Sequence, residues 1–398
     1  MIKDNYLNIN KIVDDKKIMR LFLVVKSYGG VLRFVGGCVR DALMGKKGFD
    51  LDLATDLSPD ELVEACEEEG VTTKAIGISH GTVGVIINGK MLEVTSLRKD
   101  IKTDGRHAVV EYTDDWSVDA SRRDLTINAV YADEKGNVFD YFNGMDDLEK
   151  GIVRFIGNPD TRIKEDYLRI IRFFRFHGEY AKTPINQKAL NACIENKSGL
   201  KKISAERLRM ELEKILKAEY PEKIMQLIFE NGILDAILPH PQEYDTLSRF
   251  KSFSSDAMLR LFALYQPDEK LIKNLAIILK LSNKDKDLFY EIAKANVDAR
   301  VFLNDEELYK SIYLYSKEAV KVKFLLAIAK NKVDENLKDE ILEKINNFNI
   351  PVFGLKGSDV IKAGVPQGVE VKNTLKMLEE KWVDSNFSLS KEDLLINL

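Results

Sequence analysis

The sequence predicts an α+β protein with its strands confined to the first part and helices filling the rest. Short runs of β-branched and apolar residues recur before about residue 140. After residue 160 the apolar residues repeat at spacings of three and four, which is typical of amphipathic helices. The turn signals change in YFNGMDDLEKG (141–151), so we expect a domain boundary there.

Five runs in the first part have the length and composition of strands, each bounded by glycines or charged residues. They are VLRFVGG (31–37), FDLDLAT (49–55), GTVGVIING (81–89), KMLEVTSLR (90–98) and LTINAVYAD (125–133). One intervening helix has a clear start, because Ser58 suits the N-cap, Pro59 the first helical position and Glu61 a capping box. We assign this signal to folding and not to chemistry.

The helical part contains runs with apolar faces. They are TRIKEDYLRIIRFFRFHGEY (161–180), SAERLRMELEKILKA (204–218), PEKIMQLIFENGILDAIL (221–238), KNLAIILKL (273–281) and VKVKFLLAIAK (320–330). Near the end, glycines and a proline precede a final helix within 353–382, which predicts a small terminal subdomain. The same apolar faces are able to pack internally or across a dimer, so the oligomeric state stays open.

Composition excludes several classes of protein. Three scattered cysteines, which we expect to be buried thiols, suggest neither a disulfide framework nor a zinc site. The first 17 residues lack an apolar core, and no later stretch reaches about 18 uninterrupted apolar residues, so we expect no membrane segment and a cytoplasmic location. The net charge is −4, but residues 150–217 contain sixteen Lys/Arg against eight Asp/Glu, which suits a nucleic-acid backbone. A solvated helical face is the alternative.

The clearest chemical signal lies in VGGCVRDALMGKKGFDLDLAT (35–55). Gly36 and Gly37 follow an apolar strand and precede a helical stretch, so backbone N–H groups there are able to approach a triphosphate. Asp50 and Asp52 are two residues apart on an expected strand, which places both carboxylates on one face. Such a pair suits two Mg²⁺ ions about 3.5–4 Å apart, one activating an attacking hydroxyl and one neutralising pyrophosphate. Exposed acids at a strand edge are the alternative.

A neighbouring strand offers a third carboxylate. Glu93 lies in the run KMLEVTSLR, and the metal site and a solvent-facing position are equally good interpretations of it. Farther on, Arg122 and Arg123 are adjacent, so one is expected to contact phosphates while the other pairs with an acid such as Asp119 or Asp124. Asn128 is expected where a strand begins, to bind a ribose hydroxyl or to close a turn.

The third group of candidates opens a helix. Asp166 and Arg169 are three positions apart, and Glu165 and Arg169 four, so all three are expected on one helical face. A carboxylate beside a guanidinium is able to read the edge of cytosine or adenine. A routine intrahelical ion pair is the alternative. Arg172 and Arg175 extend the basic edge, whereas we expect the phenylalanines 173, 174 and 176 to belong to the core.

Taken in order, these motifs resemble one enzyme family. GGCVRD and DLDLAT, then RRDLTINA (122–129), EDYLRIIRFFRF (165–176) and ISAERLRMEL (203–212), are similar to the successive motifs of class II CCA-adding enzymes and of bacterial poly(A) polymerases. The resemblance spans about residues 30 to 215. It implies a polymerase-β-type nucleotidyltransferase head with a mixed sheet (1–145), followed by an all-α neck (146–220), body (221–345) and tail (346–398).

The resemblance also implies roles for individual residues. Metal ions would be held by Asp50 and Asp52. The other implied contacts are Gly36, Gly37 and Arg40 with the triphosphate, Arg122, Arg123, Asp124 and Asn128 with sugar and phosphates, and Asp166 and Arg169 with the base, Glu165 orienting Arg169. The stretch KDIKTDGRHAVVEYTDD (99–115), which includes Asp104 and Arg106, corresponds to the flexible loop used in switching from C to A addition. The 354–382 segment is similar to a tail that cradles the tRNA elbow.

The activity implied is the addition of CMP, CMP and AMP to a tRNA 3′ end from CTP and ATP, without a nucleic-acid template. Poly(A) polymerase, CC-adding and A-adding enzymes of the same family are the alternatives. A non-catalytic RNA-binding protein is a remote alternative, because an abandoned site has no physical reason to keep two repelling carboxylates.

Overall fold

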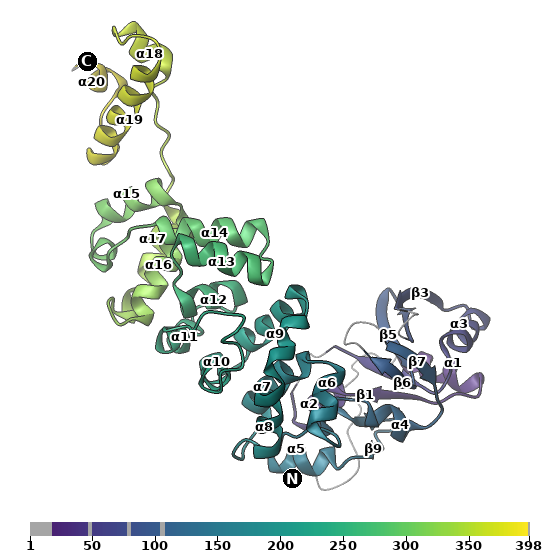
Figure 1. Cartoon of the computed structure of the whole chain (residues 1–398). Helices are drawn as coiled ribbons and strands as arrows, with labels where there is room; N and C mark the ends of the chain where they lie inside the picture. Colours follow the sequence, from purple (N-terminus) through teal and green to yellow (C-terminus); the bar gives the residue numbers. More distant parts are fainter. Residues whose placement is uncertain (1–17, 47–49, 78–80, 104–107, 397–398) are drawn as a thin grey trace. The chain divides into compact units, whose positions relative to one another are not determined.

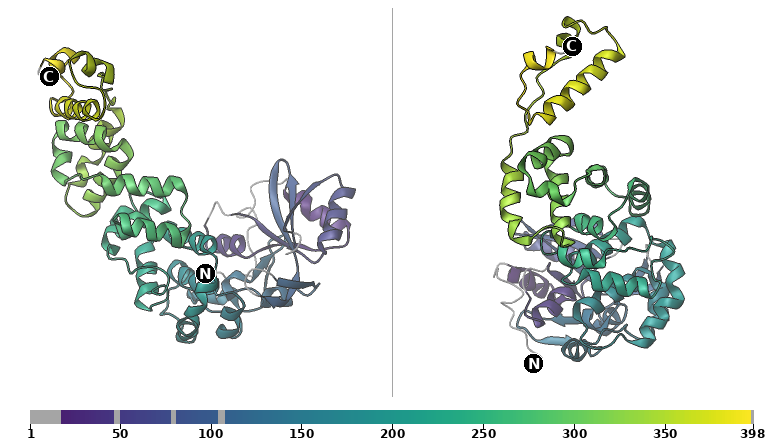
Figure 2. Two further views of the ribbon diagram at one scale, coloured as in Figure 1. Left: turned by 45° about the horizontal axis from the view of Figure 1, so that its top comes forward. Right: turned by 90° about the vertical axis from the view of Figure 1, so that its left-hand side faces the viewer.

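The computed structural model describes residues 18–46, 50–77, 81–103 and 108–396 (Figure 1). Contacts divide the chain into two compact units, Met1–His240 and Pro241–Leu398. The strands all lie in the first unit, and from residue 144 onward every described regular element is helical (Figures 1 and 2). The α+β class expected from the sequence is therefore confirmed, while the four predicted domain ranges stay predictions.

A mixed sheet of seven described strands forms the centre of the first unit. Its strands are β1 (Leu32–Val35), β2 (Asp52–Thr55), β3 (Thr72–Gly77), β4 (Thr82–Ile87), β5 (Lys90–Ser96), β8 (Val130–Ala132) and β9 (Val138–Asp140). The order is β3-β4-β5-β2-β1-β8-β9. Only β2 and β5 pair in parallel among these strands, and their register places Asp52 opposite Glu93. Two expected acidic residues therefore meet on neighbouring strands.

Helices cover both faces of this sheet. Buried side chains of α1 (Met19–Ser27), α2 (Gly37–Leu43) and α3 (Pro59–Glu68) join those of the central strands in one apolar core. On the opposite face, Trp116 and Ala120 of α4 (Trp116–Ser121) pack with Tyr131. The predicted start of α3 is confirmed, since Ser58 and Glu61 form a capping box with Pro59 in the first turn.

The predicted strands are only partly right. LTINAVYAD begins as the 3₁₀ turn η4 (Thr126–Asn128), and only its second half is the strand β8. The strands β3 and β9 were not expected from the sequence. The stretch 99–115 was expected to be a flexible loop, but most of it forms a two-stranded hairpin of β6 (Arg98–Thr103) and β7 (Ala108–Tyr112). Asp104 and Arg106 lie outside the described residues.

Helices complete the first unit beyond the sheet. They are α5 (Gly144–Lys150), α6 (Pro159–Glu165), α7 (Leu168–Tyr180), α8 (Gln187–Asn196), η5 (Lys197–Lys202), α9 (Ala205–Lys217) and α10 (Pro221–Glu230). The run 161–180 was expected to be helical, with a helix opening at residues 165–169, and it is interrupted at Asp166, whose backbone is extended (φ −155°, ψ 106°). The phenylalanines 173, 174 and 176 are buried in α7 as expected.

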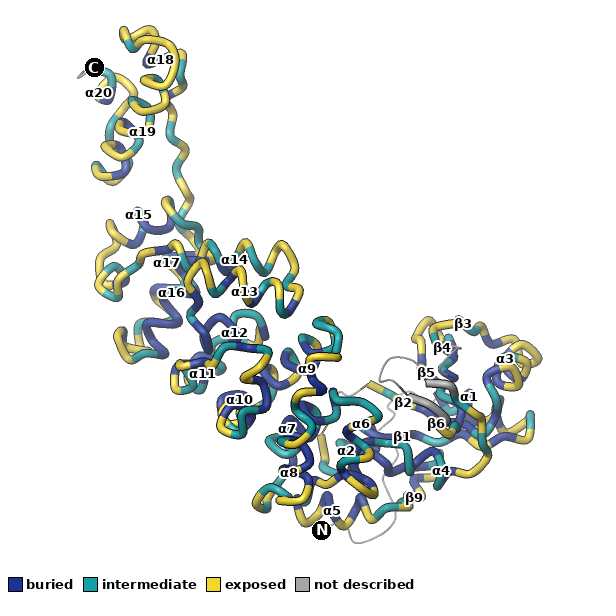
Figure 3. The backbone as a smooth tube through the Cα atoms, viewed as in Figure 1, coloured by how far each residue is buried: buried dark blue, intermediate teal, exposed yellow. Residues whose placement is uncertain are grey.

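The second unit is helical throughout its described residues. Its elements are α11 (Tyr244–Phe250), α12 (Ala257–Tyr265), α13 (Glu269–Leu279), α14 (Asn283–Lys294), η6 (Ala299–Leu303), α15 (Asp305–Tyr315), α16 (Lys317–Ala329), η7 (Glu335–Leu337), α17 (Lys338–Asn347), α18 (Gly357–Lys362), α19 (Val369–Asp384) and α20 (Lys391–Leu395). The last three enclose a small core around Trp382. We expected an amphipathic helix at 320–330, but α16 is buried along most of its length because α11, α14, α15 and α17 surround it (Figure 3).

Cys38, Cys66 and Cys193 are free and buried, as expected. None of the described helices is both long enough and apolar enough to cross a membrane.

Candidate active site

One cavity of the first unit gathers most of the candidates. It has a volume of about 600 Å³ and lies where the β1–α2 turn, the start of β2, the turn after α4 and helices α6, α7 and α9 converge. It is lined by Gly36, Gly37, Arg40, Asp41, Asp50, Asp52, Arg122, Arg123, Asp124, Asn128, Asp166, Arg169, Arg172, Arg175, Phe176 and Lys214. Glu93 and Glu165 are the two candidates that do not line it.

The β1–α2 turn requires glycine at its first position. Gly36 is the N-cap of α2 and has φ +71°. This conformation is unfavourable for residues that have a Cβ atom. The N–H of Gly36 donates to the Val130 carbonyl at 3.0 Å, so this group holds the turn against β8. The N–H of Gly36 is therefore not among the groups that this turn is able to offer to a triphosphate.

Asp50 and Asp52 form an acidic corner of the cavity. Asp52 is the first residue of β2, whereas Asp50 precedes the strand, so the expectation that both lie on the strand is wrong. Both carboxylates still line the cavity. Partial desolvation raises the pKa of Asp52, Glu93 and Asp50 raise it further, and Arg123 opposes them. The corner is thus rich in negative charge.

The two carboxylates of this corner are suitable ligands for a divalent cation. Neither Asp50 nor Asp52 forms an ion pair with any residue that the structure describes. Carboxylate oxygens are the ligands that Mg²⁺ prefers. The described residues contain no group of three or more His, Cys, Asp or Glu side chains arranged to hold a metal, so the protein ligands that this corner offers are the two carboxylates.

Asp119 fixes the two adjacent arginines that line the cavity. It is almost fully buried, and its carboxylate accepts from Arg122 Nη2 at 2.6 Å, from Arg123 Nη2 at 3.1 Å and from Tyr131 Oη at 2.7 Å. Despite the desolvation, the two guanidinium groups lower the pKa of Asp119 to about 2. We expected only one of the two arginines to pair with an acid, and that expectation is wrong. Both are held by one carboxylate and still line the cavity.

A chain of polar side chains connects α2, η4, α7 and α9. Arg40 Nη1 donates to the side-chain Oδ1 of Asn128, and Asn128 Nδ2 donates to Asp124 Oδ1 at 3.0 Å. Arg172 Nε donates to Asp124 Oδ2 at 2.7 Å and its Nη1 reaches Glu211 at 3.3 Å. Arg172 and Asn128 lower the pKa of Asp124 against its burial. Asn128 is the last residue of η4, so it closes a turn, as one of the two expectations had it, and does not begin a strand.

The third group straddles the break between α6 and α7. Arg169 Nη1 donates to Glu165 Oε2 at 2.6 Å, and its Nη2 donates to the Arg122 carbonyl at 2.9 Å. Asp166 instead accepts from Arg207 Nη2 at 2.6 Å and from the backbone N–H of Leu168 at 3.1 Å. The shared helical face expected from the sequence is therefore wrong. Asp166 and Arg169 nevertheless line the same cavity.

Several residues that were not expected at the active site line its cavity or pack beside it. Asp41 and Lys214 line the cavity, as does Phe176, whose ring lies 4.9 Å from the Arg40 guanidinium. Arg175 is buried and pairs with Glu211 at 2.9 Å. A signal for Asp41 was available, since it directly follows Arg40 in the glycine motif. No signal marked Lys214, because a lysine at a helix end is ordinary.

Two family models match this chain. One is described as the poly(A) polymerase head domain and matches residues 32–154, which contain the sheet. The other is described as a probable RNA- and SrmB-binding site of polymerase A and matches residues 184–244. The carboxylate pair lies inside the first match.

Similar proteins have names that agree with these models. The chain is 36% identical to mouse mitochondrial CCA tRNA nucleotidyltransferase 1 over 375 residues, covering 92% of this chain and 85% of the mouse protein. It is 30% identical to the CCA-adding enzyme of Ligilactobacillus salivarius, covering 96% and 95% of the two chains.

Solved structures give the same answer. The Bacillus stearothermophilus CCA-adding enzyme in complex with CTP has a TM-score of 0.79 and 25% identity, and the match covers 96% of this chain and 95% of that one. The Thermotoga maritima CCA-adding enzyme complexed with tRNA shares the fold, with a TM-score of 0.64 and 20% identity over 97% and 96% of the chains. Enzymes with this nucleotidyltransferase head generally use divalent metal ions. The chain belongs to the family of CCA-adding tRNA nucleotidyltransferases.

Proposed function

We propose that this enzyme adds CMP, CMP and AMP in turn to the tRNA 3′ end, with Asp50 and Asp52 holding two Mg²⁺ ions. One observation carries the proposal. A single cavity combines two carboxylates without ion-pair partners among the described residues with arginines contributed from the turn after α4 and from α7. Acids beside arginines suit a metal-bound triphosphate, since the arginines bind phosphate oxygens while the acids bind the cations.

When bound, Mg²⁺ would activate the terminal ribose hydroxyl and neutralise the departing pyrophosphate. The protein's own part is to bind and orient. Arg122 and Arg123, fixed by Asp119, present guanidinium donors to phosphate oxygens at the cavity surface. Asn128, held between Arg40 and Asp124, is positioned to contact the nucleotide sugar. Glu93, on the strand beside Asp52, raises the negative potential of the metal site without lining the cavity.

Base selection belongs to the break between α6 and α7. The Asp166 carboxylate is able to accept from the exocyclic amine of cytosine or adenine, and the Arg169 guanidinium is able to donate to ring acceptors. Arg169 Nη1 lies 2.6 Å from Glu165 Oε2, and this ion pair orients the guanidinium. Because these groups are protein side chains, no nucleic-acid template is required for the choice.

The test is incorporation on a labelled tRNA that ends before its CCA. Purified enzyme is incubated with Mg²⁺ and CTP alone, ATP alone, or both. We expect two additions with CTP and a third only when ATP is also present, and EDTA should stop all of them. A stop after two C residues with both nucleotides would indicate a CC-adding enzyme, and a long A ladder a poly(A) polymerase. Either result would contradict the proposal.

A cytoplasmic location stays a prediction from the sequence, because the similar mouse protein is named as mitochondrial.

A further inference from the structure

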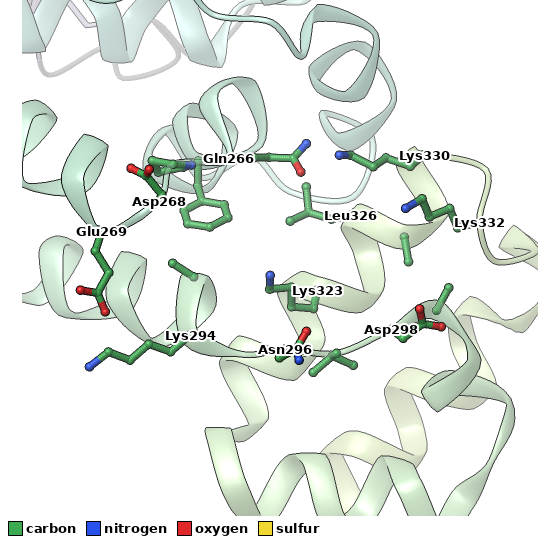
Figure 4. Close-up of a pocket in the computed structure, with 16 residues that line it drawn as sticks. Gln266, Asp268, Glu269, Lys294, Asn296, Asp298, Lys323, Leu326, Lys330 and Lys332 are labelled. Atoms are coloured by element: carbon green, nitrogen blue, oxygen red, sulfur yellow. The ribbon is translucent and has the colours of Figure 1, made fainter.

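The second unit contains a cavity that has no part in the proposed reaction. It has a volume of about 600 Å³ and lies among α12, α13, α14 and α16 (Figure 4). Phe262 and Leu326 contribute apolar surface, and Gln266 and Asn296 contribute amides. Nine of the sixteen lining residues are polar or charged, so the cavity suits a ligand that carries charge beside a smaller apolar part.

Four lysines and three carboxylates line this cavity. Lys323, Lys330 and Lys332 extend their ammonium groups toward its centre, as Figure 4 shows. Lys294 also lines the cavity, but its side chain points away from the centre. Cations that converge on one space repel one another, and an anion bound between them lowers this repulsion.

Lys323 gives the strongest indication. It belongs to α16, the central and otherwise largely apolar helix of the unit, and its side chain is half-buried. No carboxylate of the described residues lies within ion-pair distance of it. Desolvation lowers the pKa of Lys323, and the neighbouring Lys330 lowers it further. A partly desolvated ammonium group without a counter-ion is unfavourable, so a bound anion would reduce this cost.

The acidic residues near the cavity act on Lys330 and Lys332, since Glu243 interacts electrostatically with both and Asp298 with Lys332. No acid among the described residues acts on Lys323. Asp268 caps α13 through the N–H of Leu271 at 2.7 Å, and Asp298 pairs with Arg300 at 3.1 Å. In Figure 4 the carboxylates of Asp268 and Glu269 point away from the lysines. Lys330 does pair with Glu243 at 3.0 Å, which leaves Lys323 and Lys332 without an ion-pair partner among the described residues.

We propose that this pocket binds the phosphate group of a free, nucleotide-sized ligand, with Lys323, Lys330 and Lys332 as its cationic contacts. A phosphate offers about two negative charges and three acceptor oxygens to the three ammonium groups. Phe262 and Leu326 provide apolar contact for the rest of the ligand. A duplex backbone is convex and presents its phosphates to exposed cations, so the concave, partly apolar shape favours the free ligand over RNA.

The test uses the full-length enzyme and GDP as the probe, titrated calorimetrically in buffer with EDTA so that metal-dependent binding is removed. Inorganic pyrophosphate serves as a second probe without a base. Lys323→Gln should weaken the GDP affinity at least about tenfold, because it removes a charged contact. Lys294→Gln changes the same charge at a side chain directed away, and should alter the affinity less than about twofold. If Lys323→Gln unfolds, Lys332→Gln replaces it, because Lys332 is exposed and its substitution should not disturb the fold. This variant should also weaken the GDP affinity.

Three further results decide the matter. CMP incorporation at saturating tRNA should be the same in Lys323→Gln and in the unchanged enzyme, which separates this pocket from the active site. If neither GDP nor pyrophosphate shows binding that depends on Lys323 or Lys332, the proposal is overturned. It is also overturned if the lysine variants weaken tRNA binding alone, because the pocket would then contact the RNA backbone.

Discussion

Asp52 is the residue on which the proposed chemistry depends most directly. Asp52→Asn keeps the size of the side chain and removes the charge that a metal ion needs. We expect CMP incorporation to fall by about a thousandfold, since metal ions supply several kcal/mol of transition-state stabilisation. Single-turnover assays measure this. Asp60→Asn, at an exposed position in the first turn of α3, is the matched control and should keep full activity.

An Asp52→Asn enzyme with unchanged turnover would rule out the carboxylate pair as the catalytic centre. It would also revive the alternative of a non-catalytic RNA-binding protein. A lower affinity for CTP with an unchanged rate of chemistry would contradict the metal role as well, because it would place Asp52 in ground-state binding alone.

Asp166 carries the proposed choice of base. Asp166→Ala should reduce the preference for CTP over UTP, taken as the ratio of kcat/KM, by about 10–100-fold, since one base-edge contact is worth about 1–3 kcal/mol. Metal-dependent addition should continue. Asp160→Ala is the control, because Asp160 accepts a hydrogen bond from Asn196 and does not line the cavity. An unchanged ratio in Asp166→Ala would contradict the role of a protein template.

The sequence predicted the side chains that line the active-site cavity more accurately than it predicted the ion pairs that those side chains form. The spacing of Asp50 and Asp52 placed both at one site even though only Asp52 lies in a strand. The pairing of Asp166 with Arg207, and of both Arg122 and Arg123 with Asp119, depends on how separate elements pack. Such tertiary contacts leave no local pattern in the sequence.

Asp119 links elements that support the arginine side of the site. Its carboxylate joins the end of α4 to the strand β8 through Arg122, Arg123 and Tyr131. Because its folded pKa is lowered to about 2, Asp119 stabilises the fold above its unfolded pKa and loses that effect as the pH falls through about 2. The pH-dependent part is about 2 kcal/mol, from about 1.4 kcal/mol per pKa unit.

Urea unfolding between pH 6 and pH 2 tests this link. The difference in the free energy of unfolding between the unchanged chain and Asp119→Asn should be largest above about pH 4 and shrink toward pH 2. Asp114→Asn, in the exposed turn before α4, is the control and should leave the profile unchanged. A difference that does not vary with pH would mean that Asp119 does not titrate in this way.

Elements with strong local signals were predicted well, and those that depend on neighbours were not. The start of α3 has a complete capping box, which is local, and it is present as expected. The periodicity did not reveal the break at Asp166, because Ile163, Tyr167, Ile170 and Phe174 keep spacings of three and four across it. The charged stretch around β6 and β7 has no alternating pattern, so its hairpin was expected to be a loop. The helix α16 is buried by surrounding helices that its own sequence does not reveal.

The division into two compact units has a consequence for the whole molecule. The candidate active site lies entirely in Met1–His240, and the apolar core around Trp382 belongs to Pro241–Leu398. The chain contains two tryptophans, Trp116 and Trp382, and they fall in different units. Trp116 packs beneath the sheet next to Tyr131, whereas Trp382 packs against Tyr313. Each fluorophore therefore reports on one unit.

We expect the two units to unfold in separate steps. Trp116→Phe and Trp382→Phe variants, each with one remaining tryptophan, should give different urea midpoints in fluorescence. CTP with Mg²⁺ at about 100 times its dissociation constant should stabilise the first unit by about 2.7 kcal/mol and leave the midpoint reported by Trp382 unchanged. Coincident transitions that shift together on adding CTP would show that the chain unfolds as one cooperative body, because a ligand stabilises every part that unfolds together with its site.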